Sequence, residues 1–473
     1  MTIVSSILAQ PGERTAVIYG KREISYAELA SDIHRAAAYL RDCGLAGKII
    51  GIHLGPPQTE TDYPTWIAHL AAMRIGAEHV SITKGVMLDR LPVKLDALVG
   101  RIPEDATSKL KLVVPFDLDS MPDAADSADD EANAARLSPT SGTTGEPKLI
   151  RWDAATMAER VAQAAEVGEI TADSRVGSAL TLRTTAGFRY PLATWCAGGC
   201  VLLSNRVRDE MGRPAIFRSS LLVCSPFQLA SLVKNGRPWP GKEDRTVAVL
   251  GGRVPPALRE WALANLGTEV LNSYGSTEVG NIAHGDAALA SRHPGAVGYV
   301  RKGLELRIVG DKGKPVAAGT PGRIQVRSAA RPKAGEKKPE WFEPGDIGLL
   351  FDDGLLAIEG RDAEIVNVGG MKVAAGEIET EMRAISGVAD VGISVVDTSA
   401  GEAIAVAILP DGQPQLQALL PSIRPLLPAG AEFKMFFIGA IPRNDMGKID
   451  RPKLADSVRL ALNPPQPQAK VDA

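Results

Sequence analysis

A short segment rich in glycine and hydroxyl side chains is the part of this sequence best suited to chemistry. Glycine permits backbone angles that turn successive N–H groups toward one point, and such a nest binds anions. A Walker phosphate loop would need G-x-x-x-x-G-K-[ST], whereas Gly145 is followed here by Glu-Pro-Lys. The segment predicts a phosphate loop of another kind, with a plain exposed turn as the alternative. Its residues are Thr140, Ser141, Gly142, Thr143, Thr144, Gly145, Glu146, Pro147 and Lys148.

Six more segments follow this loop in a fixed order along the chain. They are GGRVP (251–255), NSYGSTE (272–278), GAVG (295–298), WFEPGDIG (341–348), GRDAEIVNVGG (360–370) and PRNDMGKIDR (442–451). The set resembles the motifs of the adenylate-forming superfamily, which comprises acyl- and aryl-CoA synthetases, peptide-synthetase adenylation domains and luciferases. The resemblance covers most of residues 138–454, and ISYAEL (24–29) with RIGAEHV (74–80) extends it weakly toward the N-terminus.

The resemblance implies a site for ATP and Mg²⁺. Tyr274 offers a flat ring for stacking on adenine. Thr277 is expected to donate to the α-phosphate, and Glu278 is a hard oxygen ligand suited to Mg²⁺. Asp346 matches the carboxylate that accepts from both ribose hydroxyls. The other nucleotide contacts that the resemblance implies are Gly251, Gly252, Arg253, Asn272, Gly275 and Arg361.

Lys448 is the predicted main catalytic group, acting with Thr277 and Glu278. Attack of a substrate carboxylate on the α-phosphorus spreads negative charge, which a positioned ammonium group stabilises. The resemblance implies that a small C-terminal domain then rotates, so that Lys448 leaves and a thiol tunnel opens beside Gly369 and Gly370. Lys372, just after this glycine pair, is a candidate phosphate contact.

Several positions depart from the family pattern. Leu149 follows the loop lysine where relatives have glycine, and Ala363 stands at the hinge position. Residues 180–195 align with the acyl-pocket strand, where Thr184 replaces the usual histidine or aromatic residue. On an extended strand Arg183 and Arg189 would share one face, with a break of that register at Gly187 as the alternative.

The acyl pocket is expected to involve Arg183, Thr184 and Phe188. An arginine directed into it would favour a small polar or aromatic acid over a long fatty acid, although a structural or exposed arginine is the alternative. The segment 180–195 contains no aspartate to bind a substrate ammonium group, which disfavours an α-amino acid.

The elements that carry these motifs alternate between strand and helix. Residues 21–45 predict a strand and then an amphipathic helix, 48–55 a buried strand, and 66–80 a helix leading to the next strand. Such alternation is typical of a parallel sheet covered on both faces. The acidic stretch 117–136 predicts an exposed, mobile connection. Residues 295–327 predict an antiparallel β unit, and 362–456 a helix at 376–385 with strands at 391–396 and 402–409.

The predicted fold is therefore α/β. A large multi-sheet N-terminal domain (1–360) has βα layers and a small β unit, and binds the acyl group and nucleotide. A smaller α+β lid domain (361–460) is mobile, and a disordered tail (461–473) follows.

Composition narrows the class of protein. A length of 473 residues and a hydrophobic content of 45% allow more than one core. A net charge of -3 argues against a general nucleic-acid binder. The four cysteines are too scattered for a disulfide framework and are expected to be small core residues. Without a signal peptide or an apolar run of membrane-spanning length, a cytoplasmic location with no membrane partner is expected.

The leading function is an ATP-dependent ligase that forms an acyl-adenylate from a small carboxylic acid, releases pyrophosphate and then makes a thioester. CoA or the phosphopantetheine of an acyl carrier protein is the expected thiol. One alternative is a stand-alone adenylation enzyme that activates an amino or aryl acid for a carrier protein or an amine. Another is a catalytically degenerate relative that binds a nucleotide or acyl ligand. Retention of Lys148, Glu278, Asp346, Arg361 and Lys448 together argues against the last.

Overall fold

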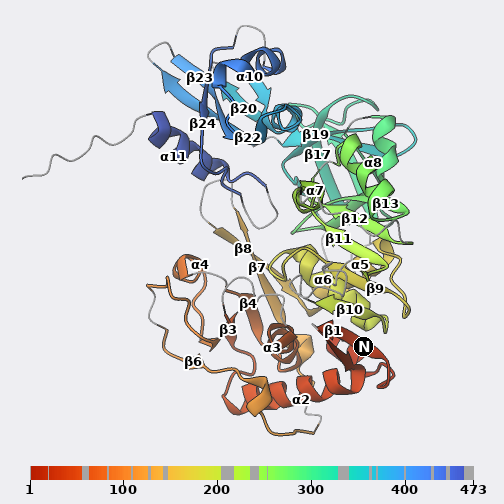
Figure 1. The fold of residues 1–473 in the computed structure, drawn as a ribbon. Helices are drawn as coiled ribbons and strands as arrows, with labels where there is room; N and C mark the ends of the chain where they lie inside the picture. The colour runs from red at the N-terminus through yellow and green to blue at the C-terminus, as the bar shows by residue number, and fades with distance from the viewer. Residues whose placement is uncertain are drawn as a thin grey trace, which may run out of the picture. The chain divides into compact units, whose positions relative to one another are not determined.

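The chain forms two compact units in the computed structural model, Met1–Arg301 and Lys302–Ala473 (Figure 1). The predicted division at residues 360 and 361 falls inside the second unit and stays a prediction. The predicted disordered tail lies outside the described residues apart from its first two. The structure describes residues 2–19, 21–55, 63–82, 85–107, 110–125, 129–141, 147–203, 218–234, 244–252, 254–293, 295–328, 340–361, 365–368, 371–398, 401–427, 431–443 and 448–462.

One sheet of the first unit is mainly parallel. Its strands follow the order β15-β14-β13-β12-β11-β9-β10-β1-β2. The strands in the stretch β13-β12-β11-β9-β10-β1 of this order run parallel to one another. Strands β2, β14 and β15 are antiparallel to their neighbours. The bounds are β1 Thr15–Tyr19, β2 Arg22–Ser25, β9 Arg175–Ser178, β10 Cys200–Leu203, β11 Leu221–Cys224, β12 Thr246–Leu250, β13 Glu269–Ser276, β14 Gly280–Asp286 and β15 Ala296–Val300.

A second sheet of this unit follows the order β6-β5-β3-β4-β7-β8. All neighbours are parallel except β7 and β8, which form an antiparallel hairpin. The predicted strand in 48–55 is confirmed, and so is the predicted helix within 66–80 that leads to the next strand. The bounds are β3 Ile49–His53, β4 Glu78–Ser81, β5 Ala97–Gly100, β6 Val113–Val114, β7 Ala135–Ser141 and β8 Pro147–Asp153.

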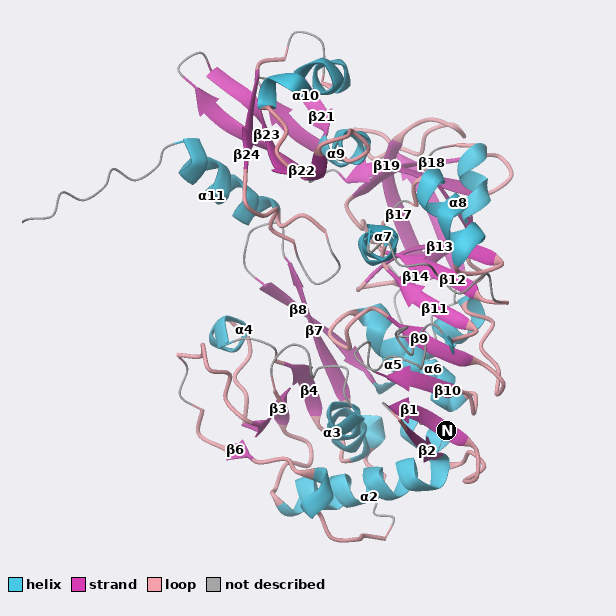
Figure 2. Ribbon diagram, viewed as in Figure 1, coloured by secondary structure: helices cyan, strands magenta, loops and turns pink. Residues whose placement is uncertain are grey.

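Helices cover these sheets and lie between them. The amphipathic helix predicted within 21–45 is confirmed as α2. A capping box of Ser25 and Glu28 starts this helix, and its apolar positions from Tyr26 to Leu40 are buried. Figure 2 shows α3 beside β3 and β4, and α6 beside β9 and β10. Trp66 of α3 meets Trp195 of α6 edge to face at 5.1 Å, so these two buried helices form an inner layer. The bounds are α1 Ile3–Leu8, α2 Tyr26–Asp42, α3 Tyr63–Arg74, α4 Gly85–Asp89, α5 Ala154–Val167, α6 Thr185–Cys196, α7 Pro226–Lys234 and α8 Pro256–Asn265.

The acidic stretch 117–136 is predicted to be exposed and mobile. Most of residues 117–125 are exposed, as predicted, but the prediction is wrong for the C-terminal end, where Glu131 and residues 134–136 are buried. The mobility stays a prediction. Glu131 is 1% exposed and accepts the backbone N–H of Val4 at 2.9 Å. Asp129 forms an ion pair with Arg74 at 2.8 Å. Acidic side chains that look solvated in sequence therefore hold the N-terminal helix α1 and the end of α3. Short 3-10 turns at Leu118–Ser120 and Glu131–Asn133 precede β7.

The second unit begins with antiparallel strands, as predicted for the region up to residue 327. Strands β16 to β19 pair in sequence order. A β20–β21 hairpin follows, and then a sheet in which β22 pairs antiparallel with β23 and β24 pairs parallel with β23. The bounds are β16 Leu304–Val309, β17 Gly322–Ser328, β18 Asp346–Leu350, β19 Leu355–Arg361, β20 Ile365–Val368, β21 Met371–Ala374, β22 Val388–Thr398, β23 Gly401–Pro410 and β24 Phe433–Phe437.

Three helices pack on the β22–β24 sheet and give it a core of its own. They are α9 (Ala375–Met382), α10 (Leu416–Ile423) and α11 (Arg451–Leu462). One face of the sheet buries Ile393 and Ile404 with α9 and α10, and the other packs against Leu454 of α11. The predicted helix at 376–385 and both predicted strands are confirmed.

Two expectations from composition can be compared with the described part of the chain. Cys224 is buried, and Cys43, Cys196 and Cys200 are half-buried free thiols. Among the helices that the structure describes, none combines the length and apolar character needed to cross a bilayer.

Candidate active site

The predicted phosphate loop lies at the tip of the β7–β8 hairpin. Thr140 is paired with Lys148 and Ser141 with Pro147, so the two ends of the loop face each other across the hairpin. Pro147 is the first residue of its strand, a position that tolerates the missing N–H. Residues Gly142, Thr143, Thr144 and Gly145 lie outside the described residues.

The segment NSYGSTE occupies the end of β13 and the turn into β14. Asn272 is buried, Tyr274 is half-buried and Gly275 is exposed. A Cβ at Gly275 would lie 2.1 Å from the carbonyl oxygen of Gly280, so this position excludes any side chain. Thr277 and Glu278 follow in the turn, where the Glu278 side chain is exposed.

Two buried side chains hold this turn by donating hydrogen bonds to its backbone carbonyl oxygens. Trp152 at the end of β8 donates its indole N–H to the carbonyl oxygen of Thr277 at 3.0 Å. Arg160 of α5 donates to the carbonyl oxygen of Glu278, also at 3.0 Å. Because Trp152 lies four residues after Lys148, the phosphate-loop hairpin and the Thr277–Glu278 turn are joined directly within the first unit. Reasoning from the sequence missed both supports.

The neighbouring polar groups hold Arg160 and the hairpin after it. Glu159 forms an ion pair with Arg160 at 3.0 Å and with Arg301 at 3.3 Å. Gln163 accepts the backbone N–H of Asn281 at 3.1 Å, and Arg301 donates to the carbonyl oxygen of Asn281 at 2.8 Å. The turn therefore rests on a connected polar network in which Arg160 and Gln163 are buried and Glu159 is exposed, and these contacts fix its backbone.

The predicted adenine-binding turn lies next to Tyr274. Leu250, the last residue of β12, pairs with Ser273 in parallel register, so Gly251 and Tyr274 follow at the same edge of the sheet. Gly251 has a φ of 88°, which suits glycine. Ligands of α/β sheets bind at such carboxyl ends of parallel strands.

Asn272 supplies an acceptor at this edge. Its side-chain oxygen is buried and has no hydrogen-bond partner among the described residues. A buried acceptor of this kind is costly unless a ligand or water completes it, and an adenine amino group is a donor of the right type. Gly252 is placed two residues after β12, and Arg253 lies outside the described residues.

Asp346 and Arg361 lie in the second unit. Asp346 is the first residue of β18, is 5% exposed, and is directly paired in backbone register with Arg361 at the end of β19. The structure thus brings the two predicted ribose-side residues together, although the Arg361 side chain is outside the described atoms. A buried carboxylate suits the two hydroxyls of a ribose.

Lys448 is half-buried and lies just before a short bridge between Arg443 and Ile449. The Asp450 N–H donates to the carbonyl oxygen of Pro442 at 2.9 Å and closes this segment. Gly369 and Gly370, predicted beside the thiol tunnel, fall outside the described residues between β20 and β21. Ala363 lies outside them as well. Lys372 is in β21, where its backbone pairs with Asn367.

The predicted acyl-pocket strand is wrong, because residues 185–196 form helix α6. Thr184 is its N-cap: the hydroxyl accepts the N–H of Gly187 at 2.9 Å and donates to the carbonyl oxygen of Thr181 at 2.9 Å. Since the helix starts after Arg183, the expectation that Arg183 and Arg189 share a strand face also fails. Arg189 is 5% exposed inside the inner helix layer.

Phe188 is covered by an arginine that the sequence did not single out. The Arg136 guanidinium lies 3.8 Å from the centroid of the Phe188 ring and donates to the carbonyl oxygen of Leu182 at 2.6 Å. Trp66 stacks on Phe188 with ring centroids 5.6 Å apart. Arg136 therefore fixes the segment that leads into Thr184, and sequence reasoning, which placed Arg136 at the end of the acidic stretch 117–136, missed this role.

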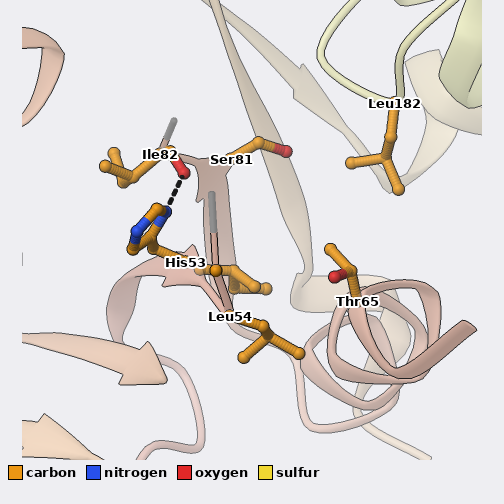
Figure 3. Close-up of a pocket in the computed structure, with 8 residues that line it drawn as sticks. His53, Leu54, Thr65, Ser81, Ile82 and Leu182 are labelled. Atoms are coloured by element: carbon orange, nitrogen blue, oxygen red, sulfur yellow. Dashed lines mark hydrogen bonds between the residues drawn. The ribbon is translucent and has the colours of Figure 1, made fainter. Parts of the chain in front are cut away.

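A small cavity lies next to the same segment (Figure 3). It has a volume of about 10 Å³, enough for about one water. His53 contacts the carbonyl oxygen of Ile82 at 2.8 Å on one side, and Thr65, Ser81 and Leu182 line it as well. None of the predicted site residues lines this cavity, although Leu182 directly precedes Arg183.

The residues near the turn can accommodate Mg²⁺. Within the described ranges, no group of three or more His, Cys, Asp or Glu residues could hold a metal ion alone. Mg²⁺ at nucleotide sites is commonly bound through one or two carboxylates together with phosphate oxygens and waters. One exposed carboxylate, Glu278, fits that mode, in a turn that is bonded through Trp152 to the hairpin carrying the predicted phosphate loop.

Comparison with known proteins gives a family model, relatives and a solved structure that the chain resembles. A family model described as AMP-binding enzyme matches residues 5–331. The chain is 27% identical to an indoleacetate–CoA ligase of Aromatoleum aromaticum, over 93% of this chain and 94% of the relative. It is 26% identical to a salicylyl-CoA synthase/salicylate adenylyltransferase of a Streptomyces species, over 95% and 91%. The structure of Bacillus subtilis o-succinylbenzoate coenzyme A synthetase with ATP and magnesium shares the fold, with a TM-score of 0.78, 21% identity and coverage of 96% and 99%.

Proposed function

The chain belongs to the AMP-binding enzyme family, and from this premise we propose that it is an AMP-forming acid–thiol ligase. In the first step a carboxylate oxygen attacks the α-phosphorus of ATP, and the bond to the β-phosphate oxygen breaks to release pyrophosphate. In the second step a thiolate attacks the acyl carbonyl carbon, and AMP leaves. One observation carries the proposal: Trp152 and Arg160 fix the Thr277–Glu278 turn beside the phosphate-loop hairpin.

The residues of the first unit are assigned to the nucleotide. Thr140, Ser141 and Lys148 with the intervening loop bind the phosphates, and Tyr274 stacks on adenine beside Gly251. Thr277 donates to the α-phosphate. Glu278 holds Mg²⁺, which when bound neutralises charge on the phosphates.

The residues of the second unit are assigned to the ribose and the reaction itself. Asp346 accepts from the ribose hydroxyls, with Arg361 beside it. Lys448 stabilises the charge that develops at the α-phosphorus. Residues 361–460 act as a mobile lid, so that Lys448 serves adenylation and is withdrawn for thioester formation, when Gly369 and Gly370 border the thiol.

A small aromatic or polar acid is the proposed substrate class. The names of the two relatives, an indoleacetate ligase and a salicylate synthase, support an aromatic acid. CoA is the proposed thiol, since both names specify a CoA product or ligation. A carrier-protein thiol is the alternative acceptor.

Pyrophosphate release measured with a panel of carboxylic acids, with and without CoA, tests the proposal. Aromatic and short polar acids should give acid-dependent release, and CoA should increase turnover. If none of the acids in the panel supports pyrophosphate release, the proposed activity is contradicted. If a long saturated acid gives faster release than every aromatic or short acid, the proposed substrate class is contradicted.

A further inference from the structure

A bidentate ion pair holds the chain just before Lys448. Arg443 places its guanidinium on Asp390, with N–O distances of 2.7, 2.7 and 3.0 Å. Both side chains are 14% exposed. Arg383 of the segment after α9 donates to the same carboxylate at 3.1 Å. Asp390, near the start of β22, therefore accepts hydrogen bonds from two arginines. One of them, Arg443, is the residue at which the segment carrying Lys448 begins.

A second ion pair holds the chain just after Lys448. Arg451, the first residue of α11, donates to both oxygens of Glu379 at 2.7 and 3.1 Å. Glu379 in α9 is 2% exposed and also accepts the N–H of Ile393 at 2.7 Å. Arg451 in turn donates to the carbonyl oxygen of Ile393 at 2.8 Å. Both ends of the segment are thus fixed to β22.

The base of the segment between the two ion pairs is closed by backbone contacts. Arg443 and Ile449 form an isolated bridge, and the Asp450 N–H donates to Pro442 at 2.9 Å. Ile441 and Leu454, which flank it, are buried in one apolar cluster. Lys448 therefore lies in a segment that is fixed at both ends by two-pronged ion pairs, Arg443–Asp390 before it and Arg451–Glu379 after it.

Forked, largely buried ion pairs are a poor means of adding stability but a good means of fixing orientation. The cost of burying the two charges offsets most of their attraction, so apolar residues in place of the ion pair would stabilise the unit equally well. A guanidinium bound to both oxygens of a carboxylate fixes direction as well as distance. Catalysis is sensitive to displacements of about 1 Å, so orientation of this segment has a functional consequence.

We propose that Arg443 and Arg451 are positioning residues that set the direction of Lys448 through Asp390 and Glu379. The proposal rests on the proposed function of Lys448 in adenylation. It predicts that loosening either ion pair lowers the adenylation rate and leaves thioester formation from supplied acyl-adenylate intact. A purely structural role would lower both half-reactions together.

The test compares Asp390→Asn, Glu379→Gln and Arg443→Lys with the wild type. Asp456→Asn is the matched control, because it removes an exposed ion pair with Arg459 on α11 of the same unit. Pyrophosphate release with the best acid should fall by up to about 100-fold in kcat in Asp390→Asn, with KM for ATP unchanged. Arg443→Lys keeps the positive charge but not the bidentate contact, so its loss in kcat should be smaller than that of Asp390→Asn. Thioester formation from supplied acyl-adenylate should stay within about twofold.

Hydrogen exchange separates this proposal from the proposed function. The peptide containing Ile449 and Asp450 should exchange faster in Asp390→Asn than in the wild type or in Asp456→Asn, because the Asp450 N–H is protected by the closed segment. If the wild type makes no acyl-adenylate with any acid, the proposed function fails and exchange alone decides the positioning. Unchanged exchange with unchanged adenylation, or an equal fall in both half-reactions, would overturn the positioning proposal. Glu379→Gln replaces Asp390→Asn if the latter does not fold.

Discussion

At the scale of single residues, Lys448 is expected to separate the two half-reactions. Lys448→Ala should lower acyl-adenylate formation by about 10²- to 10³-fold, the usual loss when one preorganised charge is removed. Thioester formation from supplied acyl-adenylate should remain near the wild-type rate. Lys434→Ala, an exposed lysine on β24, provides the control. Equal losses in both half-reactions would contradict a role confined to adenylation.

Trp152 is the residue whose removal should show that the turn is held in place. Trp152→Phe keeps most of the buried ring but leaves the Thr277 carbonyl without its 3.0 Å indole donor. An unsatisfied buried acceptor costs about 1–3 kcal/mol, and this contact is part-buried, so the free energy of unfolding in urea should fall by about 1 kcal/mol. KM for ATP should rise as well, because the Thr277–Glu278 turn loses one of its two supports. A stability loss without any change in ATP kinetics would show that Trp152 serves the fold alone.

At the scale of elements, the N-cap of α6 is the clearest test of the corrected acyl segment. Thr184→Val removes the hydroxyl that accepts the Gly187 N–H. The free energy of unfolding should fall by about 1 kcal/mol, the usual cost of losing such a cap. Thr184→Ser keeps the cap and should stay close to the wild type in the same denaturant titration. Were this segment a strand, as the sequence suggested, valine would be tolerated and serine would be the poorer residue.

The α3–β4 contact makes stability depend on pH. His69 and His79 are fully buried, with their Nδ1 atoms 2.8 Å apart. Burial lowers the pKa of both well below the ordinary value, and the nearby Arg136 charge lowers each further. Ser81 contacts the other nitrogen of His69 at 3.1 Å.

At the scale of the whole molecule, this pair should make the protein less stable in mild acid. A histidine with a lowered pKa in the folded state binds fewer protons there than when unfolded. Stability is therefore fully present above the unfolded pKa of about 6.5 and is lost as the pH falls below it. Each histidine contributes about 1.4 kcal/mol per pH unit in that range.

Urea unfolding at several pH values from about 7.5 to about 5, on both sides of the unfolded histidine pKa, measures this effect. A variant with His69→Phe and His79→Gln should show a shallower fall, while His53 and His284, whose pKa values burial also lowers, remain in both proteins. Parallel curves for the two proteins would mean that the pair is not responsible.

Much of the molecule was predictable from the sequence because the signals are local. The stripe from Tyr26 to Leu40 predicted α2, since helical spacing and one buried face repeat within a single element. The ordered motifs identified the family. Glycine stands at 251, where φ is positive, and at 275, where a side chain would meet the Gly280 carbonyl. Backbone freedom and close approach are properties that the residue type itself reports.

Only the tertiary structure showed what supports the site and where the periodic signal fails. The donors to Thr277 and Glu278 are 125 and 118 residues away, and no local pattern links Trp152 or Arg160 to those carbonyls. Helix α6 is buried on nearly every side, so it has no polar face to mark its period, and nothing in the sequence opposed the strand that the family resemblance implied. Long-range hydrogen bonds and all-round burial depend on which elements pack together, and that is decided by the folded core and not by any one segment.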